Sequence, residues 1–265
     1  MAELGVEIAG VGTAIVTRDP EVLGVVRGLY KGFLSTGSSG WRIEMKVEAA
    51  PSPSFAGDLV VRRDGDRAHF AVRRGDFAGT LDLRHRAGVA TLSAGDEVPV
   101  DSFLRILYSL ALLEVRGLVL HAASLIRRGR AHLFCGPSGS GKTTVARLSP
   151  DATLLSDELS IVRIFDKRAR CYGTPFSGEL ARAGEDRAAP LGGIYFLHHG
   201  RDHAIEAVKP RQALQRLLPN VLFFARDAEL TARVLGIAAD LVEAVPCFDL
   251  SFWLDPGFWE VIESA

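Results

Sequence analysis

The sequence has few cysteines and almost no net charge. Its 265 residues include three cysteines, Cys135, Cys171 and Cys247, and 31 lysines and arginines stand against 32 aspartates and glutamates. Because the cysteines are far apart and lie in apolar stretches, they argue against a disulfide framework and favour a reducing compartment. A formal net charge of −1 provides no broad attraction for nucleic acid or anionic lipid. We therefore expect neither a nucleic-acid nor a membrane partner.

The sequence also lacks long hydrophobic runs, and its first residues do not have the pattern of a secretory signal. The chain begins Met1-Ala2-Glu3-Leu4, with an acidic residue where a secretory signal requires basic ones. No run approaches the roughly 18 apolar residues that a membrane-spanning helix needs. We therefore expect a cytoplasmic protein.

Two regions of different patterning divide the chain. With 48% hydrophobic and 24% charged residues, it can form one large or two modest domains. From Trp41 to Ser93, short alternating runs are separated by turn pairs such as Asp64-Gly65, which predicts an antiparallel meander with one solvated face. We assign residues 1–99 to a smaller, mainly antiparallel β domain and residues 100–265 to an α/β domain.

Residues 100–265 mix helix and strand patterns. A stretch that is apolar nearly all round, over 100–113, predicts a buried helix too short to cross a bilayer. A short helix that Ser149-Pro150 ends is expected after Lys142. Further helices are predicted over 210–218 and 227–242 and after residue 257, and strands over 117–126, 131–135, 153–156, 159–165, 191–197 and 245–252.

The most informative motif is a glycine-rich stretch, Gly136-Pro137-Ser138-Gly139-Ser140-Gly141-Lys142-Thr143. It is a complete GxxxxGK[ST] phosphate loop with a predicted strand before it and a helix after it, as this motif requires. Glycines let backbone amides surround phosphate oxygens, Lys142 supplies a mobile charge, and Thr143 offers a hydroxyl to Mg²⁺. We therefore predict that these residues, together with Thr144, bind a nucleoside triphosphate. A ligand-free glycine-rich turn is the disfavoured alternative.

Two carboxylates and one histidine are the candidate catalytic groups. Asp157 and Glu158 follow the predicted strand 153–156, which we expect beside the strand that leads into the loop. Because phosphoryl transfer needs an acidic Mg²⁺ ligand and a carboxylate that orients the acceptor, the pair suits this chemistry. A solvated pair of acids at a strand end is the alternative. His121 is expected on a strand beside the loop's strand, either in the site or as a hydrogen-bonded core residue.

Three further histidines, His198, His199 and His203, lie close together in the sequence. No cysteine or carboxylate stands at matching spacing, and the residues from 200 to 202 are typical of an exposed turn. We therefore do not expect a metal site there.

The order of His121, the glycine-rich loop and the Asp157-Glu158 pair resembles the HPr serine kinase/phosphorylase family. More closely, it resembles the shorter HPr-kinase-related proteins, which lack the ends of the bifunctional enzyme. The resemblance covers roughly residues 117–162, and more loosely 173–179 and 190–197, and nothing before Val100 takes part. It implies a P-loop, HPr-kinase-like core in residues 100–265.

The resemblance also implies roles for individual residues. His121 matches the family's active-site histidine, Lys142 the phosphate-loop lysine and Thr143 the Mg²⁺ hydroxyl. The acidic pair matches two aspartates, one of which accepts the proton of the substrate serine. Because the second position is Glu158, the choice of base between Asp157 and Glu158 stays open, and Glu158 joins Thr143 as a candidate metal ligand.

One family segment is missing from this sequence. The Glu-x-Arg-Gly stretch, whose glutamate helps to hold Mg²⁺, is replaced in its region by Pro190-Leu191-Gly192-Gly193. This departure puts phosphorolysis and recognition of HPr in doubt. Glu179 is a substitute candidate for the metal ligand.

These observations predict an ATP- and Mg²⁺-dependent kinase that phosphorylates a serine or another hydroxyl of a peptide, protein or small molecule. The family resemblance is compatible with a homo-oligomer. The alternative is a nucleotide-binding regulatory or assembly module with little turnover. A GTPase switch is disfavoured because Asn220 is the only asparagine and Val221 follows it, which excludes Asn-Lys-x-Asp. The Leu-Ser-Gly-Gly-Gln stretch of ABC-type ATPases is also absent from the sequence.

Overall fold

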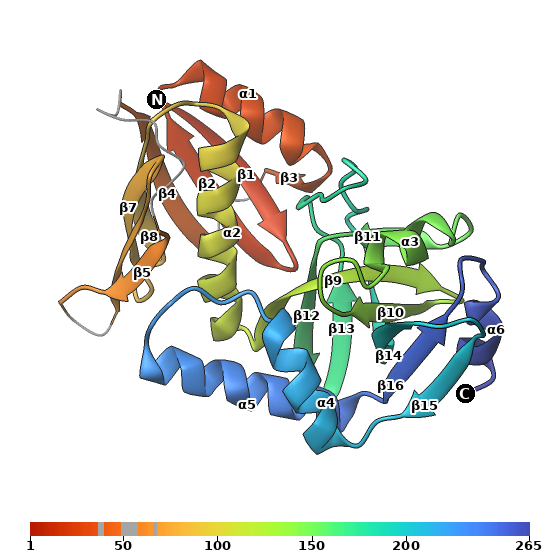
Figure 1. The fold of residues 1–265 in the computed structure, drawn as a ribbon. Coiled ribbons are helices and arrows are strands. Elements are labelled where there is room, and N and C mark those ends of the chain that lie inside the picture. Colours follow the sequence, from red (N-terminus) through yellow and green to blue (C-terminus); the bar gives the residue numbers. More distant parts are fainter. Residues whose placement is uncertain (37–39, 49–57, 66–67) are drawn as a thin grey trace. The chain divides into compact units, whose positions relative to one another are not determined.

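The chain is a mixed α/β protein with two large sheets, seen in a computed structural model that describes residues 1–36, 40–48, 58–65 and 68–265 (Figure 1). It divides into two compact units. The first contains Met1–Glu114 and Phe223–Ala232, and the second contains Val115–Leu222 and Arg233–Ala265. The predicted domain boundary after residue 99 lies inside helix α2 (Glu97–Glu114), all of which groups with the first unit.

The first unit is built on an eight-stranded sheet in the order β3-β1-β2-β4-β8-β7-β6-β5. The prediction of an antiparallel meander is confirmed for β5 to β8, which pair as successive antiparallel neighbours. It is wrong for β4, which pairs in parallel with both β2 and β8. Helix α1 (Pro20–Leu29) lies between β2 and β4 in the chain, and β5 to β7 lie between β4 and β8. The strands are β1 (Ala2–Ile8), β2 (Val11–Thr17), β3 (Leu34–Ser35), β4 (Gly40–Val47), β5 (Val60–Arg63), β6 (His69–Arg74), β7 (Phe77–Asp82) and β8 (Ala87–Leu92), and a short 3-10 turn, η1 (Lys31–Phe33), precedes β3.

Helix α2 packs across one face of this sheet, against β7, β8 and α1 (Figure 1). Phe103 meets Phe77 edge to face with ring centroids 5.8 Å apart, and the Tyr108 hydroxyl donates a hydrogen bond to the Val11 carbonyl at 3.4 Å. Both aromatic residues of α2 are fully buried. The prediction of a buried helix is therefore confirmed, and aromatic burial of this kind is a large share of a core's stability.

The second unit has its own eight-stranded sheet, in which two long strands pair with different neighbours in their first and second halves. The first half of β9 (Gly117–Arg127) pairs with β12 (Leu159–Phe165), and its second half pairs with β10 (Arg130–Cys135) and β11 (Thr153–Ser156). Similarly, β14 (Ala188–His199) pairs first with β13 (Arg168–Tyr172) and then in parallel with β10 and β16 (Cys247–Phe252). Strand β15 (Ala204–Ala207) forms the edge beside β16. As a result, β10 lies between β9 and β14, and its last residue, Cys135, lies opposite Ala122 of β9 and Phe196 of β14.

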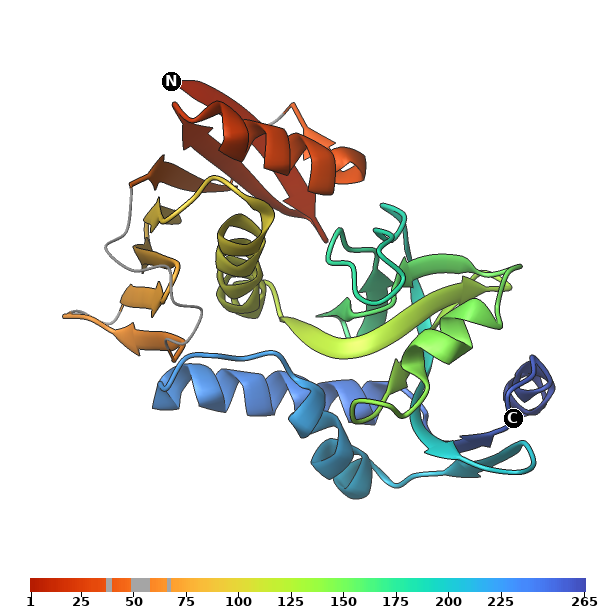
Figure 2. The same ribbon diagram turned by 45° about the horizontal axis from the view of Figure 1, so that its top comes forward.

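A continuous core fixes the position of that strand end. Helices α3 (Lys142–Arg147) and α6 (Phe258–Glu263) place Val145, Phe258 and Trp259 in one buried cluster with Phe134 of β10 and Phe252 of β16. Helix α3 lies against β9 and β10 (Figure 2). The predicted helices after 210 and 227 are also present, as α4 (Pro210–Leu217), which continues into the 3-10 turn η2 (Leu218–Asn220), and α5 (Ala228–Ala244). No helix in the described part of the chain combines the length and apolarity that a membrane crossing requires.

Candidate functional site

The glycine-rich loop follows β10 directly and leads into α3, as the sequence predicts. Gly139 and Gly141 have φ angles of +79° and +100°, a region that side-chain-bearing residues rarely adopt. A Cβ atom on Gly141 would lie 2.6 Å from Cζ of Phe252. Glycine is therefore required at position 141 both by the backbone and by the neighbouring ring.

Two residues outside the motif hold the loop. The amide of Gly136 donates a hydrogen bond to Oδ1 of Asn220 at 3.3 Å, and Nδ2 of Asn220 donates to the Arg216 carbonyl at 2.8 Å. His199 Nε2 lies 2.9 Å from the Gly139 carbonyl. Sequence analysis did not assign these roles to Asn220 and His199. The one available signal is that the buried Asn220 is the chain's only asparagine.

The ammonium of Lys142 lies inside its own loop. It donates hydrogen bonds to the carbonyls of Gly136 at 2.9 Å and of Pro137 at 3.1 Å, and the residue is only 7% exposed. Burial lowers the pKa of Lys142, while the nearby Glu158 carboxylate acts in the opposite direction. The loop therefore carries a cation whose ammonium is bound to two neutral carbonyls of the loop itself.

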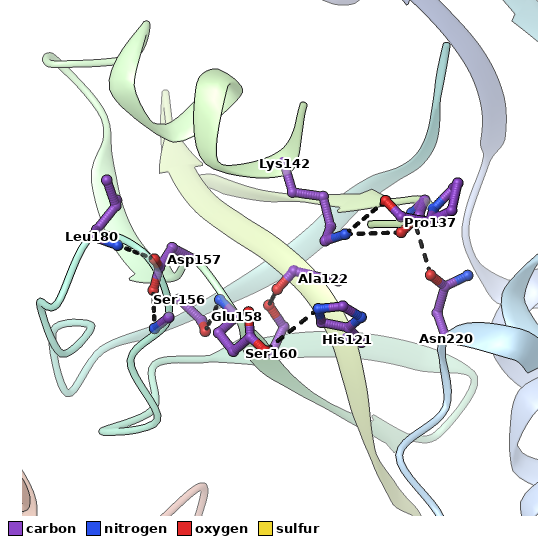
Figure 3. A network of polar contacts seen from close by, with 12 residues as sticks. His121, Ala122, Pro137, Lys142, Ser156, Asp157, Glu158, Ser160, Leu180 and Asn220 are labelled. Carbon is purple, nitrogen blue, oxygen red and sulfur yellow. Dashed lines mark hydrogen bonds and ion pairs between the residues drawn. The ribbon is translucent and has the colours of Figure 1, made fainter. Parts of the chain in front are cut away.

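A cavity of about 470 Å³ opens beside the loop, entirely within the second unit. Its walls come from β9, the loop, the start of α3, the β11–β12 turn and the segment after Phe176 (Figure 3). Most of the predicted site residues line it, namely His121, Ser138, Gly139, Gly141, Lys142, Thr143, Thr144, Asp157, Glu158 and Glu179. Gly136, Pro137 and Ser140 are not in its lining; the first two hold Lys142, and the Ser140 hydroxyl is buried without a hydrogen-bond partner among the described residues.

His121 and Glu158 face one another across the cavity wall (Figure 3). Nε2 of His121 lies 3.4 Å from Oε1 of Glu158, and the two side chains are 38% and 33% exposed. The β9–β12 pairing explains this proximity, because Leu159 lies opposite His121 and the Ala122 amide donates to the Glu158 carbonyl at 3.0 Å. Both side chains thus remain accessible from the cavity.

Asp157 has a different environment from its neighbour. It is only 2% exposed, and its two carboxylate oxygens accept hydrogen bonds from the amides of Gly178 at 3.0 Å and Leu180 at 2.9 Å. Between these two amides lies Glu179, an exposed residue that lines the cavity. Asp157 therefore fixes the segment that presents Glu179.

The strand before these acids has a different neighbour from the one expected. Strand β11 pairs with β9 rather than with β10, so that β9 separates it from the loop's strand. The acids still line the cavity together with His121, because the residue after Glu158 pairs with His121 of β9. Strand order of this kind depends on long-range pairing, which local patterns do not encode.

The histidines at 198 and 203 are engaged by carboxylates. Nε2 of His198 lies 2.9 Å from Asp249, and Nε2 of His203 lies 2.8 Å from Asp255. In the described ranges of the chain, no group of three or more His, Cys, Asp or Glu side chains is arranged to hold a metal ion. Side-chain oxygens in the cavity wall come from the hydroxyls of Ser138, Thr143 and Thr144 and the carboxylates of Asp157, Glu158 and Glu179.

Comparisons with known proteins give a family and a distant structural likeness. The model of the family described as "SynChlorMet cassette protein ScmC" matches residues 97–265, which is more than half of the chain. No curated protein matches the sequence. Among solved structures, the HPr(Ser) kinase/phosphatase from Coxiella burnetii is similar with a TM-score of 0.32 and 10% identity, covering 55% of this chain and 94% of that chain. A likeness of this degree carries no argument about activity.

Proposed function

We propose that this chain, which belongs to the SynChlorMet cassette protein ScmC family, is an ATP- and Mg²⁺-dependent phosphotransferase. It would transfer the γ-phosphate to a serine or another hydroxyl of a peptide, protein or small molecule. One observation carries the proposal: Ser138, Gly139 and residues 141–143 of the phosphate-loop motif, with its lysine, line the same cavity of about 470 Å³ as the His121–Glu158 pair. Phosphoryl transfer depends mainly on positioning and charge neutralisation, and these groups can supply both.

The nucleotide is held by the glycine-rich loop. The positive φ angles of Gly139 and Gly141 suit a loop whose amides turn toward phosphate oxygens. Lys142 exchanges its bonds to the Gly136 and Pro137 carbonyls for bonds to the phosphates. Because the carbonyls are neutral and the phosphates are negatively charged, the exchange adds a Coulomb attraction to the ammonium, which favours the bound state.

The cavity's oxygen donors fit Mg²⁺. This ion usually takes one or two protein carboxylates, substrate phosphates and water instead of a closed protein cage. Thr143 and Glu158 would hold it, with Glu179 as a further carboxylate. When bound, Mg²⁺ neutralises charge on the phosphates that are transferred and released.

The acceptor's proton passes to the His121–Glu158 pair. Both side chains are accessible from the cavity, whereas both oxygens of Asp157 already accept backbone amides. We therefore assign Asp157 as a positioning residue for the 178–180 segment. Nε2 of His121 accepts the proton of the acceptor hydroxyl, and Glu158, whose Oε1 lies 3.4 Å from Nε2, orients the imidazole.

The proposal is tested by incubating the full chain with γ-labelled ATP, Mg²⁺ and the protein products of neighbouring genes. A labelled acceptor is expected with the wild type. Lys142→Ala should weaken ATP binding at least tenfold, and Glu158→Gln should keep binding while transfer falls by at least about 10². ATP binding by the wild type without transfer to any acceptor would support the regulatory-module alternative instead.

A further inference from the structure

The hairpin formed by β12 and β13 presents basic and aromatic side chains on one face. Arg163 lies opposite Arg170, and Phe165 lies opposite Arg168, so these four side chains project from the same side of the sheet. Next to them is a hollow of about 780 Å³, whose lining includes Phe165, Asp166, Arg168, Arg170, Tyr172 and Pro190. We call the surface made by Arg163, Phe165, Arg168, Arg170 and Tyr172 the basic hairpin face.

The aromatic residues of this face are held by a cation. The guanidinium of Arg163 lies 4.6 Å from the ring centroid of Phe165 and 6.0 Å from that of Tyr172. Such cation–π contacts favour a fixed arrangement of the side chains. The face is therefore organised before any partner arrives.

The charge of this region departs from that of the chain as a whole. Arg163, Lys167, Arg168 and Arg170 are four cations, and Asp166 is the carboxylate in the lining, while the formal charge of the complete chain is −1. Arg168 and Arg170 are exposed, and neither forms an ion pair within residues 1–36, 40–48, 58–65 and 68–265. Nη2 of Arg170 donates one hydrogen bond to the Ala188 carbonyl at 3.3 Å.

Several other arginines of the same unit do have acidic partners. Arg116 pairs with Asp240 at 2.6 Å, and Arg127 and Arg128 both pair with Glu263 at 2.8 Å. The basic hairpin face and its turn thus combine four cations with one carboxylate, Asp166, which is a local excess of positive charge.

We propose that the basic hairpin face binds an extended, acidic segment of a partner polypeptide. Arg168 and Arg170 are two residues apart on one strand, so their Cα atoms are separated by about 6.7 Å. Side chains on one face of an extended peptide repeat at the same interval, so that Asp or Glu residues at alternate positions can meet both guanidiniums. Arginine also binds carboxylates through two parallel hydrogen bonds, so a pair of arginines recognises Asp and Glu better than a pair of lysines would.

Two other anionic partners fit this face less well. Bases of single-stranded nucleic acid bind by stacking on open aromatic rings, but Arg163 already lies over Phe165 and Tyr172. Anionic membranes bind amphipathic surfaces that insert large apolar groups, and Phe165, at 40% exposed, is the one large apolar side chain on this face.

The face is connected to the candidate active site through β12. This strand begins directly after Glu158 and reaches Arg163 five residues later, a span of roughly 17 Å. A polypeptide docked on the face could therefore place a hydroxyl about five extended residues away in the cavity. Binding of the acidic segment is independent of the proposed phosphotransfer, whereas this placement of the acceptor rests on it.

The test uses the full chain and two fluorescein-labelled 12-residue peptides. One alternates Glu and Thr, and the other has Gln in place of every Glu. Fluorescence anisotropy should show binding of the Glu peptide at 50 mM salt, at least tenfold weaker binding at 300 mM, and little binding of the Gln peptide. The double variant Arg168→Glu/Arg170→Glu should lower affinity for the Glu peptide at least tenfold.

The matched control is Arg201→Glu/Arg211→Glu, which makes the same change of charge at two exposed arginines outside the face. It should stay within twofold of the wild type. ATP binding by both variants reports folding and separates the two proposals: loss of peptide binding alone leaves the phosphotransfer proposal intact. Equal weakening by both double variants, or tighter binding of an oligothymidine or of phosphatidylserine vesicles than of the Glu peptide, would overturn the inference.

Discussion

Asp157 and Glu158 are neighbours in the chain, yet their carboxylates do different things. Asp157 is buried and accepts two backbone amides, whereas Glu158 is a third exposed and faces His121. The difference arises because successive residues at the end of a strand point in opposite directions. One carboxylate therefore organises a backbone segment, and the other is available to a ligand.

Amide substitutions should separate these two roles. In Asp157→Asn, an NH₂ group replaces one of the two acceptors, so that a buried amide of the 178–180 segment loses its partner at a cost of about 1–3 kcal/mol. Glu158→Gln removes an accessible charge and should change the free energy of unfolding by less than about 0.5 kcal/mol. Urea denaturation of both variants measures this. Equal destabilisation would contradict the assignment of Asp157 as the positioning residue.

The stability of the folded chain should depend on pH through His132. Burial lowers its pKa to about 4 in the folded chain, while an unfolded histidine titrates near 6.5. Between these values the unfolded chain binds the additional proton, so stability falls as the pH falls from about 6.5 to about 4. The loss attributable to His132 is up to about 3 kcal/mol at the lower end of this window.

The measurement is urea denaturation at pH 7, 5.5 and 4.5. His132→Phe keeps a ring beside Tyr195 and Trp259, whose centroids lie 5.7 and 5.1 Å away, but cannot be protonated. This variant should lose less stability than the wild type over the same interval, whatever its stability at pH 7. Parallel curves for the two proteins would show that the proton binds elsewhere.

At the scale of elements, the glycine-rich loop is fixed by its own backbone and by neighbours distant in sequence. Phe252 at the end of β16 closes on Gly141, and Asn220 in η2 holds Gly136. The ends of β10, β14 and β16 and the turn η2 thus position the loop, and all of them belong to the second unit. If the loop binds a nucleotide as proposed, we expect Lys142 to be the part of the loop that moves.

Three glycine-to-alanine substitutions should have graded effects. Gly139→Ala meets no atom within 4 Å but has a φ of +79°, which should cost about 1–2 kcal/mol. Gly141→Ala adds the 2.6 Å contact with Phe252 to a φ of +100°, so it should cost about 1–3 kcal/mol more and weaken ATP binding. Gly236→Ala, in the open middle of α5, should stabilise by about 0.5–1 kcal/mol.

Urea denaturation and ATP titration of the three variants test the comparison. Gly236→Ala should bind ATP as the wild type does, because it lies outside the cavity lining. If Gly139→Ala and Gly141→Ala lowered the free energy of unfolding equally, the contact with Phe252 would add nothing to the cost at position 141.

At the scale of the whole molecule, nucleotide binding should couple to unfolding, because the site requires β9, β10, the loop and the β11–β12 turn together. Mg²⁺-ATP at 100 times its Kd should add about 2.7 kcal/mol to the free energy of unfolding. For a chain of this size that corresponds to a rise in Tm of about 5 °C or more. Differential scanning fluorimetry of the wild type, with Lys142→Ala as the control, measures the shift.

The outcomes of this experiment differ for each hypothesis. A shift that Lys142→Ala abolishes supports the loop as the binding site. A shift of the same size in both proteins would locate the nucleotide elsewhere, and no shift for the wild type at millimolar Mg²⁺-ATP would contradict nucleotide binding itself.

Local patterns sufficed for most elements of the second unit. The stop at Ser149-Pro150, the proline at the start of α4 and the apolar runs of β9 and β10 are all short-range signals, and the predicted helices and strands at these places are confirmed. The glycine-rich loop was likewise predictable, because its spacing and its flanking elements lie within about twenty residues.

Only the tertiary structure decided which groups meet. That β11 pairs with β9, that Asn220 reaches Gly136, and that β4 pairs in parallel with β8 depend on contacts between distant segments. The same holds for the division of labour between Asp157 and Glu158, because it depends on amides contributed twenty residues later. Sequence thus determined the local conformations and the chemical groups, while long-range pairing and burial determined their partners, since those energies arise only when the chain has closed on itself.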